Sequence, residues 1–246
     1  PCVTGCDALR MGTDGASATF SLGGKSVTVS EGDFITIDGS NGQVYLGEVP
    51  TVEADLGGEI ARLLSWADRR RRLDVRTNAD TPKDVARAVE LGAGGIGLCR
   101  TEHMFFGDDR IIAVREMILA ANGEERAAAL AKLEPFQRQD FEGIFRALGG
   151  RPATIRLLDP PLHEFLPKED DEVGALAASL GMPKDTVWEK VRGLAEQNPM
   201  LGHRGCRLGI TFPEIYDMQV RAIFEAALKV VQEGIHVVTE IMMHLV

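Results

Sequence analysis

The feature that most constrains the fold is a regular alternation of strand-like and helical segments that begins at Leu73. Short apolar runs with β character alternate with stretches in which apolar residues recur at helical spacing. The strands are predicted at residues 73–77, 95–100, 153–158 and 236–243, and the helices near 81–91, 109–121, 124–148, 171–180, 184–197 and 211–232. Repeated βα units predict an α/β fold with a parallel sheet, either a barrel or a doubly wound sheet. Four such strands are half of a (β/α)8 barrel.

The beginning of the chain has a different pattern. Short β-branched runs separated by Gly, Asn and Asp predict hairpins there, with strands at residues 18–22, 25–29, 33–37 and 43–46. Beyond Pro50, apolar residues recur at helical spacing and predict a connecting helix. The predicted organisation is a β-rich segment, a linker helix and an α/β domain, at residues 1–49, 50–73 and 74–246.

Two helix starts have a recognisable capping pattern. Thr81 is followed by Pro82 and then by Asp84, which predicts Thr81 as the N-cap with a proline in the first turn. Thr211 is followed three residues later by Glu214, which predicts a second capped start for the long helix that runs to about residue 232.

Composition excludes several classes of partner. The formal net charge is -10, which argues against nucleic acid and anionic membranes as the main partners. No uncharged apolar stretch approaches the ~18 residues that a membrane-spanning helix needs. The four cysteines do not form a disulfide framework, and this favours a reducing, cytoplasmic setting.

Some other motifs predict only structure. Residues 92–97 match the glycine pattern of a dinucleotide-binding turn, but they follow a helix and enter a strand, so we interpret them as a helix stop. Cys2 and Cys6 have no second Cys or His pair at a metal-ligand spacing, and we expect both to be buried thiols. The arginine run at 69–72 is interpreted as a solvated helix end.

Three arginines carry the strongest functional signal. Arg100 and Arg156 lie at the carboxyl ends of predicted strands, and Arg204 lies in a glycine-rich loop. Guanidinium groups that converge at the carboxyl end of a parallel sheet form a site for a small, highly charged anion. The alternative is that each arginine pairs with a local acid, such as Glu102 or Asp159.

Two histidines, His103 and His203, lie beside these arginines. We expect neither histidine to have the nearby acid that would mark it as a general base. We therefore expect both histidines to position their neighbours through hydrogen bonds.

Three segments then carry a family resemblance, at residues 91–106 (LGAGGIGLCRTEHMFF), 156–165 (RLLDPPLHEF) and 198–208 (NPMLGHRGCRL). They resemble signatures of the pyruvate, phosphate dikinase family of phosphoenolpyruvate-utilising enzymes. Residues 1–6 (PCVTGC) resemble the segment that follows the phosphorylated histidine of this family. The resemblance extends over the whole chain.

The resemblance implies a function and a domain assignment. Members of the family interconvert ATP, pyruvate and phosphate with AMP, phosphoenolpyruvate and pyrophosphate, and a swivelling domain carries the phosphohistidine. Residues 1–49 would be the last part of that swivelling domain, and residues 74–246 would be the first four βα units of the phosphoenolpyruvate/pyruvate-binding (β/α)8 barrel. Arg100, Arg156 and Arg204 match the arginines that bind this substrate. Mg²⁺ as cofactor, a homodimer and a cytoplasmic location are also implied.

The resemblance also implies what is missing. Both chain ends are interpreted as cuts through a longer protein, and no Thr-Ser-His-Ala segment is present. The phosphorylated histidine, the acid cysteine and the Mg²⁺ ligands are expected outside this internal fragment, so no catalytic or metal-binding residue is assigned and the piece is expected to be inactive alone. Cys99 and Cys206 do not match that acid cysteine.

One departure and two alternatives stay open. Thr239 and His244 stand where the family usually has prolines, which puts the geometry of the last strand end in question. In the first alternative, the chain is a relative of phosphoenolpyruvate synthase or of the phosphotransferase-system enzyme I. In the second, it is a non-catalytic anion-binding module.

Overall fold

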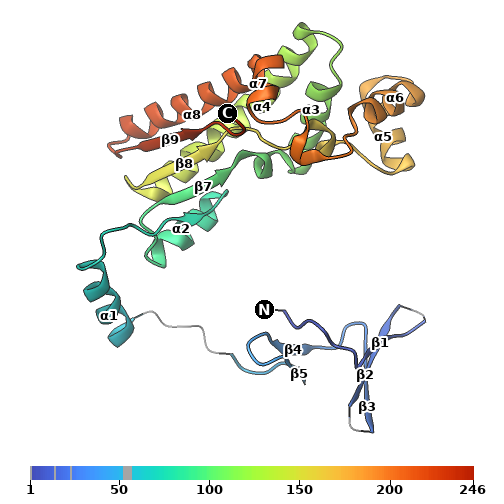
Figure 1. Cartoon of the computed structure of the whole chain (residues 1–246), viewed down its shortest axis with the longest axis vertical. Coiled ribbons are helices and arrows are strands. Elements are labelled where there is room, and N and C mark those ends of the chain that lie inside the picture. The colour runs from blue at the N-terminus through green and yellow to red at the C-terminus, as the bar shows by residue number, and fades with distance from the viewer. Residues whose placement is uncertain (1, 14, 23, 52–56) are drawn as a thin grey trace. The chain divides into compact units, whose positions relative to one another are not determined.

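The computed structural model describes residues 2–13, 15–22, 24–51 and 57–246. Its contacts divide the chain into two compact units, an N-terminal unit, Pro1–Ser65, and a C-terminal unit, Trp66–Val246 (Figure 1). Parts of the predicted segments lie outside the described residues: Gly23 in the first hairpin turn, residues 52–56 of the linker, and Pro1 in the family-like N-terminal segment.

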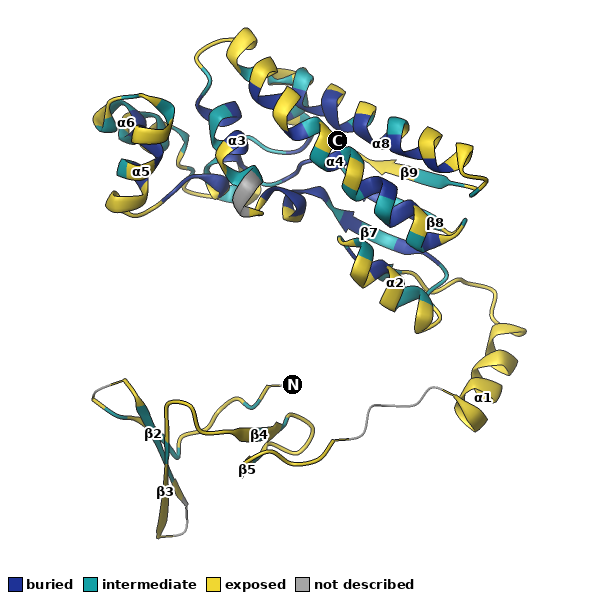
Figure 2. Ribbon diagram, turned by 180° about the vertical axis from the view of Figure 1, so that it is seen from behind, coloured by how far each residue is buried: buried dark blue, intermediate teal, exposed yellow. Residues whose placement is uncertain are grey.

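The N-terminal unit consists of hairpins, as its turn residues predict. One antiparallel sheet contains β1 (Leu9–Met11), β2 (Ser17–Leu22) and β3 (Lys25–Ser30), and a separate hairpin contains β4 (Ile35–Asp38) and β5 (Gln43–Leu46). Gly42 has a φ of 75° in the turn between β4 and β5, a conformation that glycine adopts without a steric cost. No described residue of this unit is buried, as the prevalence of yellow and teal in Figure 2 shows.

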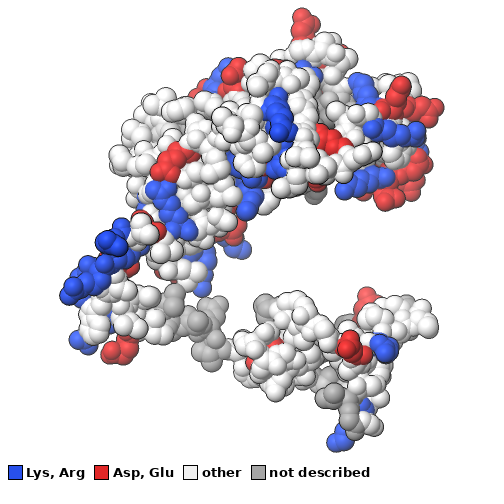
Figure 3. All heavy atoms as spheres, in the orientation of Figure 1, with Lys and Arg blue, Asp and Glu red and all other residues white. Residues whose placement is uncertain are grey.

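The predicted connecting helix is α1 (Gly58–Asp68). It has no buried residue, and the arginines that follow it are exposed, as expected for a solvated helix end. Figure 3 shows Lys and Arg gathered at the end of α1. Arg71 forms ion pairs with Asp68 and Asp74, at N–O distances of 3.1 and 2.6 Å.

The C-terminal unit is built on a parallel sheet, which confirms the predicted α/β class. Its strands lie in the order β6 (Thr77–Asn78), β7 (Ile96–Arg100), β8 (Pro152–Arg156) and β9 (Val238–Met242). All three neighbouring pairs are parallel. The four strands form an open sheet among the described residues, so closure into a barrel stays a prediction.

The first predicted strand is much shorter than expected. The prediction covered residues 73–77, whereas the strand contains only Thr77 and Asn78. Leu73 and Val75 are 84% and 67% exposed, so the apolar side chains that suggested a strand have no layer to pack against. Alternating apolar residues favour a strand only where one of its faces is buried.

The described C-terminal unit contains the six predicted helices in the predicted order, together with one short helix, Cys206–Thr211, and three short 3-10 turns that were not predicted. The helices are α2 (Pro82–Glu90), α3 (Asp108–Leu119), α4 (Gly123–Leu148), α5 (Asp170–Leu180), α6 (Lys184–Leu194), α7 (Cys206–Thr211) and α8 (Pro213–Gln232). The turns are η1 (Thr101–Phe105), η2 (Leu162–Phe165) and η3 (Pro199–Leu201). Helix α4 packs against α2, α3 and α8 (Figure 1).

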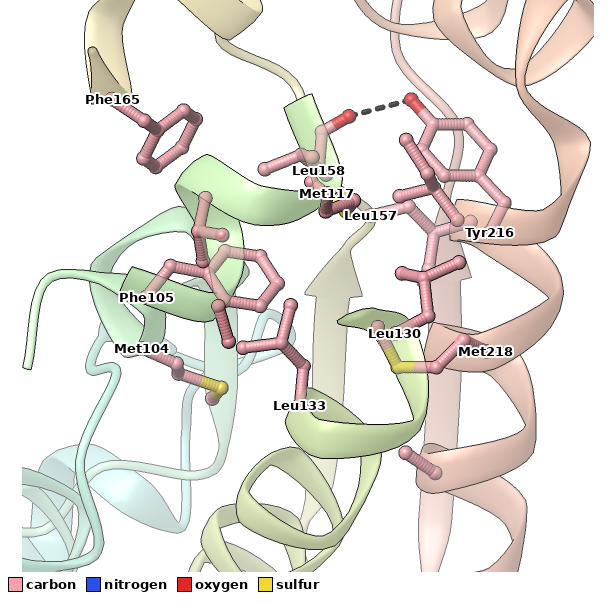
Figure 4. Packing of buried hydrophobic residues seen from close by; sticks show 14 of the residues in the cluster. Met104, Phe105, Met117, Leu130, Leu133, Leu157, Leu158, Phe165, Tyr216 and Met218 are labelled. Atoms are coloured by element: carbon pink, nitrogen blue, oxygen red, sulfur yellow. Dashed lines mark hydrogen bonds between the residues drawn. The ribbon is translucent and has the colours of Figure 1, made fainter. Parts of the chain in front are cut away.

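The core lies between these helices and one face of the sheet. Ile96 and Cys99 of β7 and Ile155 of β8 are fully buried, whereas Glu240 on β9 is exposed. Figure 4 shows aromatic and aliphatic side chains from α3, α4 and α8 packed beneath the segment that follows β8. Interdigitated apolar side chains of this kind supply most of the folding free energy.

One of the two predicted helix caps is present and the other is wrong. The hydroxyl of Thr81 accepts a hydrogen bond from the backbone N of Asp84 at 3.2 Å, so α2 begins as predicted. Helix α8 has no side-chain cap. Thr211 is instead the last residue of α7, and its hydroxyl donates to the carbonyl of Arg207 at 3.1 Å. The hydroxyl is therefore already engaged by the preceding helix.

The glycine segment at 92–97 ends α2 and leads into β7, which confirms its interpretation as a helix stop. Gly92 has a φ of 91°, a conformation that L-residues rarely adopt. The predicted burial of Cys2 and Cys6 is wrong, because both thiols are exposed. The physical reason is that the hairpins around them form no buried layer.

Candidate functional site at the carboxyl edge of the parallel sheet

The three predicted arginines lie at the carboxyl edge of the parallel sheet. Arg100 is the last residue of β7 and Arg156 is the last residue of β8, and the two are direct register partners. Arg204 precedes α7, in the loop that follows η3. Because parallel strands end at the same edge, Arg100 and Arg156 emerge side by side. The structure brings Arg156 and Arg204 together on one carboxylate, that of Asp159.

Asp159 is the centre of this cluster and is fully buried. Arg204 donates to its two oxygens from Nη2 at 2.5 Å and from Nε at 3.2 Å, in the forked geometry typical of arginine–carboxylate pairs. Arg156 Nη1 lies 2.9 Å from Oδ2, and His244 Nδ1 lies 2.6 Å from Oδ1. Asp159 therefore joins the ends of β8 and β9 to the loop that carries Arg204.

The pKa of Asp159 lies below its ordinary value. Burial alone would raise it, but the hydrogen bonds from Arg204 and His244 and the positive charges of Arg156 and Arg204 outweigh that effect. The pKa of Arg204 is raised in turn, mainly by its hydrogen bonds to Asp159. The carboxylate and the guanidinium thus hold each other in their charged forms.

Arg156 has a second carboxylate partner. Its Nη2 donates to Oε1 of Glu102, a residue that is 5% exposed and follows β7. The Nε of Arg156 and the Oε2 of Glu102 are buried without hydrogen-bond partners in the described part of the molecule. A buried polar atom without a partner is costly, so this pair has unused hydrogen-bonding capacity at the site.

Arg100 differs from the other two arginines. Within the residues that the structure describes, its guanidinium forms no hydrogen bond or ion pair, while its backbone N donates to Oδ1 of Asp80 at 2.5 Å. The alternative of local acid pairing is therefore realised for Arg156 and Arg204, but not for Arg100. Arg100 is the guanidinium of the three that is available to a ligand without breaking an existing ion pair.

The formal charges of this edge are balanced. The arginines Arg100, Arg156 and Arg204 contribute three positive charges, and the carboxylates Asp80, Glu102 and Asp159 contribute three negative charges. Convergent arginines alone therefore do not make the site strongly positive. Anion binding here depends on which cationic donors are free and on the exchange of carboxylate partners for ligand oxygens.

The loop that carries Arg204 is held by the end of the chain and by the core. Gly205 has a φ of 55°, and a Cβ at this position would lie 2.6 Å from the carbonyl oxygen of His244. The backbone N of Cys206 donates to that same carbonyl at 2.9 Å. The buried hydroxyl of Tyr216 lies 2.7 Å from the Gly205 carbonyl and 2.5 Å from the Leu158 carbonyl, the contact drawn in Figure 4. Only glycine fits at this position.

The two positions that depart from the family pattern behave differently. His244 takes part in the cluster through Asp159. Thr239 lies on β9, and its hydroxyl is buried without a hydrogen-bond partner among the described residues. The His244 imidazole therefore contacts one side of the Asp159 carboxylate, while the effect of both departures on the geometry of the strand end stays a prediction.

One expectation about the histidines is wrong. His103 does have an acidic partner, because its Nδ1 lies 2.7 Å from Oδ2 of Asp80. Sequence reasoning missed this pair because Asp80 follows β6, 23 residues before His103. The expectation that adjacent parallel strands end at the same edge of the sheet is the signal that would have found it. His203 has no such acid, and its Nε2 lies 2.9 Å from the hydroxyl of Thr211.

The described residues offer no metal centre. No group of three or more His, Cys, Asp or Glu side chains among them is placed to hold a metal ion. The carboxylates of this edge are already engaged by arginine, histidine or backbone donors. Burial raises the pKa of the Cys99 thiol, which suits an inert core residue rather than a ligand. Among the described helices, none is long and apolar enough to cross a membrane.

A parallel sheet with arginine, histidine and carboxylate side chains at its carboxyl edge is the arrangement expected for the family of phosphoenolpyruvate-utilising enzymes. A model of this family, the PEP-binding domain of PEP-utilising enzymes, matches residues 55–246. The chain belongs to this family.

The individual relatives are pyruvate, phosphate dikinases, which confirms the resemblance drawn from the motifs. The chain is 52% identical over 246 residues to the enzyme of Clostridium symbiosum and 53% identical over 247 residues to that of Rhizobium meliloti. It is 52% identical over 248 residues to the chloroplastic enzyme of Mesembryanthemum crystallinum. Each match covers 100% of this chain but only 28%, 27% and 26% of the relative, so the chain spans about a quarter of their length.

Proposed function

We propose that this chain supplies the arginine-bearing part of the phosphoenolpyruvate/pyruvate site of a pyruvate, phosphate dikinase. The complete enzyme would interconvert ATP, pyruvate and phosphate with AMP, phosphoenolpyruvate and pyrophosphate through a phosphohistidine. The observation that carries the proposal is the convergence of Arg100, Arg156 and Arg204 at the carboxyl edge of the sheet. Similarity to dikinases over the whole chain supports it.

In this proposal the arginines bind the phosphoryl and carboxylate oxygens of the substrate. Arg100 binds first, because its guanidinium needs no carboxylate to be displaced. Arg156 and Arg204 contribute by exchanging part of their contacts with Glu102 and Asp159 for ligand oxygens. A transferring phosphoryl group carries charge that pre-placed cations stabilise as its bonds loosen, and these residues supply that stabilisation.

The proposed domain assignment follows the same family. Residues 1–49 are the last part of the swivelling domain, 50–73 a linker helix, and 74–246 the first four βα units of a (β/α)8 barrel. Strand β9 supports the barrel, because within the described sheet it pairs only with β8 and its other edge is open. Open edges of this kind pair with further strands.

Catalysis requires groups that this chain does not supply. Its sequence contains no Thr-Ser-His-Ala segment for the phosphorylated histidine. The edge carboxylates do not form a metal site, so Mg²⁺, which the family uses, would take its ligands from residues beyond those described here. We propose that the 246-residue chain alone does not phosphorylate pyruvate, that the complete enzyme is a cytoplasmic homodimer, and that neither nucleic acid nor membrane is a partner.

The test is a calorimetric titration of the chain with phosphoenolpyruvate. Arg100→Ala is expected to weaken binding about 10- to 100-fold, as expected for the loss of charge-assisted hydrogen bonds. Arg151→Ala is the matched control, because Arg151 immediately precedes β8 at the opposite edge of the sheet. Equal affinity of the wild-type chain and Arg100→Ala would count against the site. Pyruvate phosphorylation by the purified chain would contradict the proposed incompleteness.

A further inference from the structure

Asp80 connects two strand ends through its carboxylate. It lies two residues beyond β6, and its Oδ1 accepts a hydrogen bond from the backbone N of Arg100 at 2.5 Å. Its Oδ2 lies 2.7 Å from Nδ1 of His103, in the turn that follows β7. The Asp80 side chain is 15% exposed and that of His103 is 51% exposed. One largely buried carboxylate therefore fixes both the backbone of Arg100 and the ring of His103.

This arrangement leaves the other ring nitrogen of His103 available. With Nδ1 directed at a carboxylate, the ring orientation is set, and Nε2 has no hydrogen-bond partner in the described part of the chain. His203 provides a contrast, because its Nε2 is already engaged by the hydroxyl of Thr211. A half-exposed imidazole whose second nitrogen is free, held by a buried acid, is arranged for contact with a ligand rather than for packing.

The charge balance of the edge gives this nitrogen a role. Arg156 and Arg204 are committed to Glu102 and Asp159, so a ligand must compete for them. Arg100 and His103 each keep a side-chain nitrogen that a ligand can engage without displacing a carboxylate. The unpartnered Nε of Arg156, by contrast, belongs to a guanidinium that Glu102 and Asp159 already hold. Arg100 and His103 are three residues apart in the chain, and Asp80 holds both.

We propose that His103 binds the anionic substrate together with Arg100, and that Asp80 is the positioning residue of this donor pair. His103 binds as an imidazolium, whose Nε2 donates to a substrate oxygen while its Nδ1 donates to Asp80. The inference rests on the proposed function, because the substrate is taken to be phosphoenolpyruvate. It adds His103 to the three arginines and gives Asp80 a task that no local sequence signal indicates.

The first experiment measures binding of phosphoenolpyruvate to the full chain by calorimetry. His103→Phe removes the donor and is expected to weaken binding about tenfold, and Asp80→Asn is expected to weaken it by a similar or smaller factor, because the ring and the Arg100 backbone lose a charged partner. His236→Gln is the matched control, since His236 lies before β9 at the amino edge of the sheet. Circular dichroism of each variant checks its fold, and His103→Gln serves if the Phe variant is not folded.

A second experiment measures the protonation of the two ring nitrogens of His103. In ¹⁵N NMR spectra of the wild-type chain, we expect Nδ1 of the His103 ring to be protonated throughout, and we expect Nε2 to carry a proton as well, with a shift of its resonance, when phosphoenolpyruvate is bound. Asp80→Asn should abolish the preference for the Nδ1-protonated form. A purely structural histidine would keep its Nε2 resonance unchanged on addition of the substrate.

The outcomes separate this inference from the proposed function. Binding that Arg100→Ala weakens but His103→Phe and His103→Gln leave unchanged would overturn the role of His103 and leave the arginine site standing. An Nε2 resonance that does not respond to saturating phosphoenolpyruvate would have the same meaning. Absence of any saturable binding to the wild-type chain would overturn both proposals.

Discussion

The two units of this chain stabilise their strands in different ways. In the N-terminal unit, hairpin hydrogen bonds join residues close in sequence, and cross-strand pairs such as Thr19 and Thr28 are exposed. In the C-terminal unit, the hydrogen bonds between parallel strands join segments that are far apart in the sequence, and buried side chains cover them. Turn chemistry is sufficient to specify a hairpin, whereas a parallel sheet needs helices that return the chain and cover a face.

The difference extends to function. The buried polar contacts of the C-terminal unit connect elements that are far apart in the chain, as in the bond from Gln219 Nε2 to Thr101 Oγ1 at 3.0 Å. The same unit buries Asp159 and Glu102, which hold two of the three arginines. A unit without buried residues has no low-dielectric environment in which to hold charged groups in a fixed geometry. The candidate site therefore lies where the core lies.

The largest expected effect contrasts a core aromatic with an exposed one. Phe145→Ala should destabilise the C-terminal unit by about 4 kcal/mol, because Phe145 is 1% exposed and stacks near Phe141 at a centroid distance of 6.4 Å. Phe34→Ala in the N-terminal unit should change stability by less than about 0.5 kcal/mol, since Phe34 is 72% exposed. Urea denaturation followed by the fluorescence of Trp188 measures the first, and circular dichroism measures the second. Similar losses in both variants would break the comparison.

An intermediate effect is expected at the buried acid of the site. Asp159→Asn should cost about 3 kcal/mol at neutral pH, because Arg156 and Arg204 would lose the carboxylate that compensates their burial. Asp38→Asn in the N-terminal unit is the control. Among the described residues, the Asp38 side chain accepts a hydrogen bond from the backbone N of Ser40 at 2.9 Å, and its replacement should cost less than about 1 kcal/mol.

The contribution of Asp159 to the free energy of unfolding should depend on pH in a definite direction. Because the folded-state pKa of Asp159 is lowered, its contribution to stability is fully present above the ordinary carboxyl pKa of about 4. That contribution is lost as the pH falls through the lowered folded-state value. The difference in unfolding free energy between the wild type and Asp159→Asn should thus shrink in acid. A difference that stays constant from neutral pH into acid would show that the charge of Asp159 is not what stabilises the cluster.

The smallest expected effect compares two threonine hydroxyls. Thr81→Ala should destabilise the C-terminal unit by about 1 kcal/mol through loss of the N-cap of α2. Thr19→Ala removes an exposed cross-strand contact at 2.9 Å and should cost less than about 0.5 kcal/mol. Thr81→Ser retains the cap and should restore most of the loss, which thermal unfolding can measure. Failure of Ser to restore stability would exclude capping as the cause.

Much of the fold could be predicted because its signals are local. The hairpins follow from turn glycines, the start of α2 from Thr81 and Pro82, and the helix stop before β7 from Gly92. The errors arose where local patterns were overridden by their surroundings. Thr211 had the sequence of a cap but bonds to the preceding helix, and Cys2 and Cys6 had apolar character but no core around them.

Only part of the candidate site could be predicted from such local sequence signals. Arg100 and Arg156 could be placed at strand ends because a strand end is a local property, and parallel strands share an edge. The partners of these residues could not be assigned, because Asp80 and His103 come from different strand ends, as do Asp159 and His244. Such pairs depend on strand order and register, which no single segment specifies.

The sequence by itself determined the class of the protein: an alternation of strands and helices, the family-like segments and three arginines at strand ends or in a loop. Only the tertiary structure decided what those arginines are free to do. Folding pairs Arg156 and Arg204 with buried carboxylates and leaves Arg100 unpaired in the described molecule. The physical reason is that a charge moved out of water must find a compensating partner, and that partner is supplied by whichever distant segment the sheet brings alongside.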